Sequence, residues 1–212
     1  MSIEAFLPWL ILIVGGYLLG SVMFCRLICL VFYKTDICKV SSDGNPGAAN
    51  AFRCCGKVAG ASGLLLDMLK GFLPVFIAMK YLDYNNFLFA LVMFAPVFGH
   101  AFSIFHGFSG GKCISTIYGE LAALLLAWTM PTLFFVLAIA NLIFEYILKP
   151  TSGYFRAFVM FSLLILAVIP IGVYGDKLAI MVGTIAVSVL AIVKHLPLYE
   201  TTGRPKKASL SK

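Results

Sequence analysis

Charge is the scarcest property of this sequence. Only 12% of its 212 residues are Asp, Glu, Lys or Arg, whereas soluble domains carry about 25%. Apolar residues make up 61% of the chain, and the mean hydropathy is +1.00. This composition indicates an all-α integral membrane protein and leaves no room for a separate soluble domain. We therefore expect residues 1–212 to form a single integral membrane domain.

The spacing of a metal site is absent as well. The six cysteines include no CxxC pair and no zinc-like arrangement with histidine. We expect unpaired thiols, no metal and no cofactor. The first residues, "MSIEAFLPWLILIVGGYLLG", lack the basic start of a secretory signal. They predict a membrane span that is retained.

No single basic cluster is present, although the formal charge is +7. The Lys and Arg residues are scattered between apolar runs, which argues against a nucleic-acid partner. Scattered basic residues are typical of the cytoplasmic loops of a membrane protein. The tail at 199–212 is basic and polar, and we expect it to be mobile and cytoplasmic, near anionic lipid.

Long apolar runs predict about seven transmembrane helices, each of roughly 20 residues. The first run is unusually long, which suggests tilt or an extension into the interface. Pro131 is expected to separate the fourth span from the fifth; a single kinked span there gives six in all. The expected spans are 5–33, 58–79, 87–105, 114–129, 131–148, 154–174 and 178–195.

Charge sets the expected orientation. With seven spans and the N-terminus outside, twelve of the sixteen basic residues fall in inside loops or the inside tail. Only Lys80 and Lys177 fall outside, and Arg26 and Lys70 lie within spans. This bias places the N-terminus outside and the C-terminus in the cytoplasm.

A polar segment, "DGNPGAANAFR" at 43–53, falls in the first inside loop. Its glycines allow backbone N–H groups to converge on an anion. Its amides add donors, and its arginine can grip a phosphate with two N–H groups. The alternative is an ordinary turn. The candidate anion-binding residues are Gly44, Asn45, Gly47, Asn50 and Arg53.

A second polar segment, "GFSGGKC" at 107–113, lies in the next inside loop. Gly110 and Gly111 precede Lys112, which opens the fourth span. Helix N-termini attract anions, and a lysine there adds a full charge. The segment is not a nucleotide-binding P-loop, because His106 and Cys113 stand where that motif needs Gly and Ser or Thr.

Two ionisable residues lie in the second span, at Asp67 and Lys70. Their spacing puts them on one helix face. Charged residues at membrane depth are costly and usually functional. The alternative is a buried ion pair that only locks helices together.

Three histidines complete the set: His100 late in the third span, His106 in the following loop and His195 at the end of the seventh. A lone histidine is more often packed than catalytic. All three, however, are expected near the membrane face that carries the two glycine loops. This grouping favours one cytoplasmic-side site for a phosphorylated, lipid-related substrate.

Together these residues resemble the bacterial membrane glycerol-3-phosphate acyltransferases that use acyl phosphate as donor. The matching pieces occur in order over most of the chain: "DICK", "DGNPGAANAFR", "LLLDMLKG", Gly99-His100, "SGGK" and His195. The resemblance implies a seven-span enzyme of the bacterial inner membrane with a cytoplasmic site. It also implies transfer of a fatty acyl group from acyl phosphate to the 1-hydroxyl of glycerol 3-phosphate, which gives lysophosphatidic acid for phospholipid synthesis.

The resemblance also implies roles for individual residues. Arg53 grips the phosphate of the acceptor, Lys112 and the glycine loop hold phosphates, and His195 helps to position glycerol 3-phosphate. Asp43, Lys112 and His195 are the expected catalytic residues. The expected substrate-binding residues are Ser42, Gly44, Asn45, Gly47, Asn50, Arg53, Asp67, Lys70, His100, Gly110 and Gly111.

Four positions depart from the pattern of that family. Asp43 stands in place of Ser, with Ser42 as a possible substitute; Ala49 replaces Thr, Cys113 replaces Gly and Leu198 replaces Asn. Two alternatives therefore stay open. One is a paralogue acting on another phosphorylated polyol or lipid head group, and the other is a lipid or anion carrier without catalysis.

Acyl phosphate is already activated, so the expected chemistry is proximity and charge stabilisation, without a covalent nucleophile. Asp43, His195 and the substrate's own phosphate are the candidates to accept the hydroxyl proton.

Overall fold

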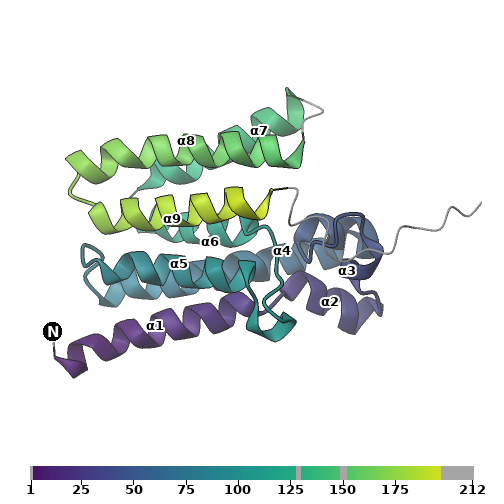
Figure 1. The fold of residues 1–212 in the computed structure, drawn as a ribbon, viewed down its shortest axis with the longest axis horizontal. Helices are drawn as coiled ribbons and strands as arrows, with labels where there is room; N and C mark the ends of the chain where they lie inside the picture. Colours follow the sequence, from purple (N-terminus) through teal and green to yellow (C-terminus); the bar gives the residue numbers. More distant parts are fainter. Residues whose placement is uncertain (1, 128–129, 149–151, 197–212) are drawn as a thin grey trace, which may run out of the picture.

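The structure is a computed structural model that describes residues 2–127, 130–148 and 152–196, and every regular element in these ranges is helical (Figure 1). The elements are α1 (Ile3–Ser21), α2 (Phe24–Tyr33), α3 (Ile37–Val40), α4 (Ala48–Tyr81), α5 (Leu88–Ala101), the 3₁₀ turn η1 (Ile104–His106), α6 (Ile114–Leu126), α7 (Pro131–Tyr146), α8 (Gly153–Tyr174) and α9 (Leu178–Lys194). The expected all-α fold is confirmed. The tail at 199–212 lies outside the described residues.

The long helices lie side by side in one bundle (Figure 1). Helix α5 packs against α1 on one side and α9 on the other, α4 packs against α6, and α8 packs against α9. Helices α2 and α3 lie at the end of the bundle opposite the N-terminus. The first polar segment therefore lies at the end of the bundle opposite the N-terminus, with α2 and α3.

The outside of the bundle is apolar. Large side chains such as Ile11 and Leu166 are 60% and 65% exposed, which a lipid environment accommodates without cost. By length and composition, four stretches of the described residues suffice to cross a membrane: Ile3–Ser21, Ala48–Tyr81, Leu88–His106 and Gly153–Tyr174. Helices α2, α6, α7 and α9 are apolar but shorter.

The expected first span at 5–33 is broken. Helix α1 ends at Ser21 and α2 begins at Phe24, which frees backbone carbonyls inside an apolar bundle. Such groups need a donor from the protein. Ser103 Oγ donates to the Ser21 carbonyl at 2.6 Å, and Lys70 Nζ donates to the Val22 carbonyl at 2.6 Å. Residues far away in sequence therefore stabilise this break, so the apolar run alone does not reveal it.

The second helix begins earlier than the expected 58–79. Helix α4 starts at Ala48, and its short first segment joins the long apolar one through a kink at Gly56, where φ is +87°. Residues 48–53 of the segment expected in the first inside loop are therefore helical. The expected separation at Pro131 is confirmed, since α6 ends at Leu126 and Pro131 opens α7.

Candidate functional site

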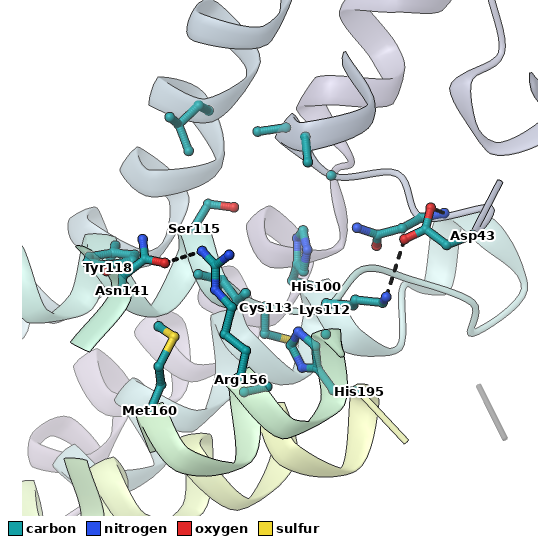
Figure 2. Close-up of a pocket in the computed structure, with 18 of the residues that line it drawn as sticks. Asp43, His100, Lys112, Cys113, Ser115, Tyr118, Asn141, Arg156, Met160 and His195 are labelled. Atoms are coloured by element: carbon teal, nitrogen blue, oxygen red, sulfur yellow. Dashed lines mark hydrogen bonds and ion pairs between the residues drawn. The ribbon is translucent and has the colours of Figure 1, made fainter. Parts of the chain in front are cut away.

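A cavity of about 480 Å³ lies where the start of α4, the starts of α6 and α8, α7 and the end of α9 meet (Figure 2). Its wall combines polar and charged groups from the two predicted loops with apolar side chains from α4 and α6. The lining residues are Asp43, Asn45, Gly47, Ala48, Ala49, Leu64, Met68, His100, Lys112, Cys113, Ile114, Ser115, Tyr118, Asn141, Gly153, Arg156, Ala157, Met160 and His195.

The first turn of α4 forms part of this wall, with Gly47 as the residue before the helix. Asn50 and Ala51 donate their N–H groups to the Gly47 carbonyl, at 3.1 and 3.2 Å. The N–H groups of Ala48 and Ala49 precede this first intrahelical bond, as at every helix N-terminus. The positive end of α4 thus borders the cavity, a position that favours a bound anion.

Asn50 organises this loop and does not line the cavity, so its role as a ligand donor stays a prediction. Its side chain is buried and donates from Nδ2 to Asp43 Oδ1 at 2.6 Å and to the Asn45 carbonyl at 2.8 Å. The Asn45 N–H also donates to Asp43 Oδ1, at 3.3 Å. These bonds hold the Asp43 carboxylate at the cavity wall.

Lys112 and Asp43 face each other in this wall, with 3.3 Å between Nζ and Oδ2 (Figure 2). Burial acts to raise the pKa of Asp43, but the hydrogen bonds from Asn50 and Asn45 and the charge of Lys112 together lower it below its usual range. Asp43 is therefore ionised at neutral pH. A carboxylate with a lowered pKa is a weak base, so its clearest role is counter-ion to Lys112.

The second loop presents Lys112 by packing tightly on the end of α5. The Gly111 N–H donates to the His100 carbonyl at 2.9 Å. A Cβ at Gly111 would overlap His100 Nε2, and a Cβ at Gly110 would overlap the His100 carbonyl oxygen. Both glycines therefore act as spacers behind Lys112, while the buried His100 ring reaches the cavity.

His195 caps the end of α9 and lines the same cavity. Its Nδ1 lies 2.7 Å from the Ala191 carbonyl oxygen, so Nδ1 carries the proton and donates. In the neutral ring the lone pair is then on Nε2. His195 can therefore orient a hydroxyl or accept its proton.

Several predicted residues lie outside the cavity lining. Ser42 is exposed, so Asp43 and not Ser42 occupies the wall. Gly44 and Gly110 line a neighbouring cavity of about 100 Å³ instead. Arg53 is exposed; it follows Ala49 by four residues on α4 and so shares its helix face.

Asp67 and Lys70 also lie outside the lining, and the structure shows the alternative role. They form an ion pair of 2.8 Å with both side chains fully buried. Lys70 also holds the Val22 carbonyl at the break between α1 and α2. The pair thus stabilises a helix junction, and its contact with substrate stays a prediction.

Sequence reasoning missed part of the site, at Tyr118, Asn141 and Arg156. Arg156 was counted only as a basic residue of an inside loop. Asn141 was available as a signal, because a polar amide within an apolar run at membrane depth is costly. Arg156 Nη2 donates to the Asn141 side-chain oxygen (Figure 2).

Comparison with known proteins identifies the family. The family model described as glycerol-3-phosphate acyltransferase matches residues 10–201. Glycerol-3-phosphate acyltransferase of Proteus mirabilis (strain HI4320) is 42% identical over 113 residues, which cover 53% of this chain and 51% of that protein. The chain thus spans about half the length of this curated relative.

The fold resembles two crystal structures of PlsY, an integral membrane glycerol 3-phosphate acyltransferase. The glycerol 3-phosphate form has a TM-score of 0.74 and 30% sequence identity, and 88% of each chain is covered. The lysophosphatidic acid form has a TM-score of 0.73 and 29% identity, with 89% of this chain and 88% of that chain covered. The chain belongs to the glycerol-3-phosphate acyltransferase family.

Proposed function

We propose that the protein transfers a fatty acyl group from acyl phosphate to the 1-hydroxyl of glycerol 3-phosphate and releases lysophosphatidic acid and phosphate. The single observation that supports this most is the cavity that joins the N-terminus of α4 with Lys112 and His195. A helix N-terminus and a lysine suit a phosphate, and a histidine beside them suits a hydroxyl. Solved relatives of the same fold hold glycerol 3-phosphate and lysophosphatidic acid.

The reaction needs few groups from the protein. The 1-hydroxyl oxygen forms the new ester bond with the acyl carbon, the bond from that carbon to the phosphate oxygen breaks, and phosphate leaves. In this proposal His195 Nε2 accepts the hydroxyl proton, and Lys112 and the α4 N–H groups hold the negative charge of the phosphates. Arg53 keeps its expected role in holding the acceptor, because it extends the α4 face that begins at Ala49.

An apolar groove supports a place for the acyl chain. A second cavity of about 210 Å³ lies between α4 and α6 and is lined by Leu65, Met68, Leu69, Phe72, Gly119 and Ala122. Met68 lines both this groove and the main cavity. An acyl chain whose carbonyl lies in the main cavity has a continuous apolar path past Met68.

For the membrane arrangement we propose seven spans in a bacterial inner membrane, with the N-terminus outside, the C-terminus in the cytoplasm and the cavity facing the cytoplasm. The cavity lining includes Lys112, Arg156 and the start of α4. Helices α2 and α3, which pack against α4, lie at the end of the bundle opposite the N-terminus. Basic residues prefer the cytoplasmic side.

The test uses the purified full chain in lipid nanodiscs with palmitoyl phosphate and glycerol 3-phosphate, and it follows lysophosphatidic acid and phosphate release together. We expect both products in equal amounts, and loss of at least about a hundredfold in kcat/KM for Lys112→Ala. Lys57→Ala is the matched control, because Lys57 is exposed and does not line the cavity. Phosphate release without lysophosphatidic acid, or binding without turnover, would contradict the proposal.

A further inference from the structure

Arg156 brings to the main cavity a cation to which the family resemblance assigns no role. It lies in the first turn of α8 and lines the cavity with Asn141 of α7 and Tyr118 of α6. In Figure 2 the pair formed by Arg156 and Asn141 lies on the opposite side of the view from the pair formed by Lys112 and Asp43. The two cations thus enter from different elements.

The guanidinium donates hydrogen bonds to two neighbours. Nη2 donates to the Asn141 side-chain oxygen, and Nη1 donates to Glu145 Oε2 at 3.0 Å. These bonds use two of the five N–H groups of an arginine. Among the described residues no other acceptor contacts this guanidinium, so its remaining N–H groups can bind two oxygens of one phosphate.

Glu145 does not cancel the charge of Arg156. Its side chain is 54% exposed and that of Arg156 is 32% exposed, and ion pairs that reach solvent are weak. The bond therefore leaves the charge of Arg156 available to a ligand. Asn141 adds orientation without adding charge.

The charge balance of the proposed reaction gives this cation a role beside Lys112 and Arg53. Each phosphate monoester carries a charge of about −1.5 to −2 at neutral pH, and the proposed reaction brings two phosphorylated molecules together. Lys112 opposes this charge, but Asp43 lies 3.3 Å from it and offsets it. Arg156 restores a positive charge to the cavity wall.

We propose that Arg156 binds the phosphate group of one of the two substrates, with Asn141 as the positioning residue. The inference rests on the proposed function only for the identity of the ligand: the shared chemistry is a phosphoryl dianion, supplied by acyl phosphate or by glycerol 3-phosphate. Arg156 is thus a substrate-binding residue, and it compensates for Asp43.

The experiment compares Arg156→Gln, Arg156→Lys and Glu145→Gln in the purified full chain. We expect Arg156→Gln to raise the KM of one phosphorylated substrate by about tenfold or more, equivalent to about 1.4 kcal/mol, while the KM of the other changes less. The substrate whose KM rises identifies the phosphate that Arg156 holds. Arg156→Lys keeps the charge but loses the two-pronged contact, so we expect an intermediate KM.

Glu145→Gln is the matched control. It removes the ion pair but leaves the guanidinium, so we expect KM values within about twofold of the parent. If Arg156 served only to join α7 and α8, Glu145→Gln would reproduce Arg156→Gln. That result, or unchanged KM values in Arg156→Gln at unchanged thermal stability, overturns the inference.

Calorimetric binding of glycerol 3-phosphate and of a non-hydrolysable acyl phosphonate separates this inference from the proposed function. If the parent binds either compound without turnover and Arg156→Gln weakens that binding about tenfold, the inference stands and the acyltransferase proposal fails. If the parent binds neither compound, the inference is overturned as well.

Discussion

Asp43 competes with a bound anion for the positive charge of Lys112. The carboxylate is held by Asn50 and Asn45 and lies 3.3 Å from Lys112, so an incoming phosphate must compete with it for the lysine. The resemblance implies a neutral serine at this position. This residue therefore decides whether the charge of Lys112 is offset by a carboxylate when the substrate arrives.

Asp43→Asn tests this arrangement with little change in shape, because the amide oxygen can still accept the bonds from Asn45 and Asn50. We expect the KM for the phosphorylated substrates to fall about three- to fivefold, since a partly exposed pair is worth up to about 1 kcal/mol. We expect kcat to stay within a few-fold of the parent. Steady-state kinetics of the purified chain measure both.

A different outcome would assign Asp43 a catalytic role. General bases contribute about a hundred- to ten-thousandfold to rate. A fall in kcat of that size in Asp43→Asn, with unchanged KM, would show that Asp43 accepts the hydroxyl proton and that its pairing with Lys112 is secondary.

At this scale the sequence predicts chemistry better than it predicts position. Asp43, Lys112, His100 and His195 were all expected in one site, and all line one cavity. Arg156 was missed because nothing in a loop arginine indicates which helix lies opposite. Cys113 shows the same limit: its φ of +67° explains why a glycine suits this position, yet the angle is visible only in the fold.

At the scale of elements, the junction between α1 and α2 depends on a distant helix. Lys70 has its charge balanced by Asp67 at 2.8 Å and gives a hydrogen bond of 2.6 Å to the Val22 carbonyl. The apolar pattern predicted most helix positions, and Pro131 marked a true helix start. It could not predict this break, because the break is stabilised by side chains remote in sequence.

Lys70→Met removes both interactions and leaves Asp67 buried without its cation. We expect a loss of stability of about 3–5 kcal/mol, the usual cost of an uncompensated buried charge. Unfolding of the purified chain in detergent, followed by circular dichroism, measures it. The double change Asp67→Leu with Lys70→Met removes the unpaired charge and is expected to recover part of the lost stability. The recovery is incomplete because the Val22 carbonyl still lacks its donor.

If Lys70→Met alone were as stable as the parent, the pair would not support the junction. An equal loss in the single and double variants would show that the bond to Val22 contributes all of the stability and the ion pair none.

The groove between α4 and α6 is expected to hold the acyl chain, which a substitution on α6 can test. Ala122→Trp fills the groove from α6, so we expect kcat/KM to fall about tenfold or more for a sixteen-carbon acyl phosphate relative to an eight-carbon one, since each buried methylene contributes about 0.8 kcal/mol. Competition between the two donors measures this ratio. Leu126→Trp is the control, because Leu126 is exposed and lies outside the groove. An unchanged ratio would place the acyl chain elsewhere.

At the scale of the whole molecule, the orientation of the bundle can be tested with a native residue. Cys54 is exposed and lies in the first segment of α4, whose first turn forms part of the cavity wall. If the cavity faces the cytoplasm, a membrane-impermeant maleimide will label Cys54 in inverted vesicles and not in intact spheroplasts. The Cys54→Ala variant gives the background from the other thiols.

The opposite end provides the matched site. Tyr174 ends α8 and is 90% exposed, so Tyr174→Cys in the Cys54→Ala background is expected to react in spheroplasts only. Labelling of Cys54 from outside would reverse the proposed orientation. Labelling of both sites from one side would contradict the odd number of spans that the seven-span arrangement places between them.

The rim of the groove between α4 and α6 carries Leu65 and Leu69, which are 65% and 40% exposed on the apolar outside of the bundle. A ligand tail in this groove can enter and leave sideways, from the leaflet, while its head group stays at the aqueous border. Turnover then responds to the mole fraction of donor among the lipids and not to its amount per volume of water. We expect turnover to slow when inert phospholipid dilutes the donor while the bulk concentration of donor stays constant.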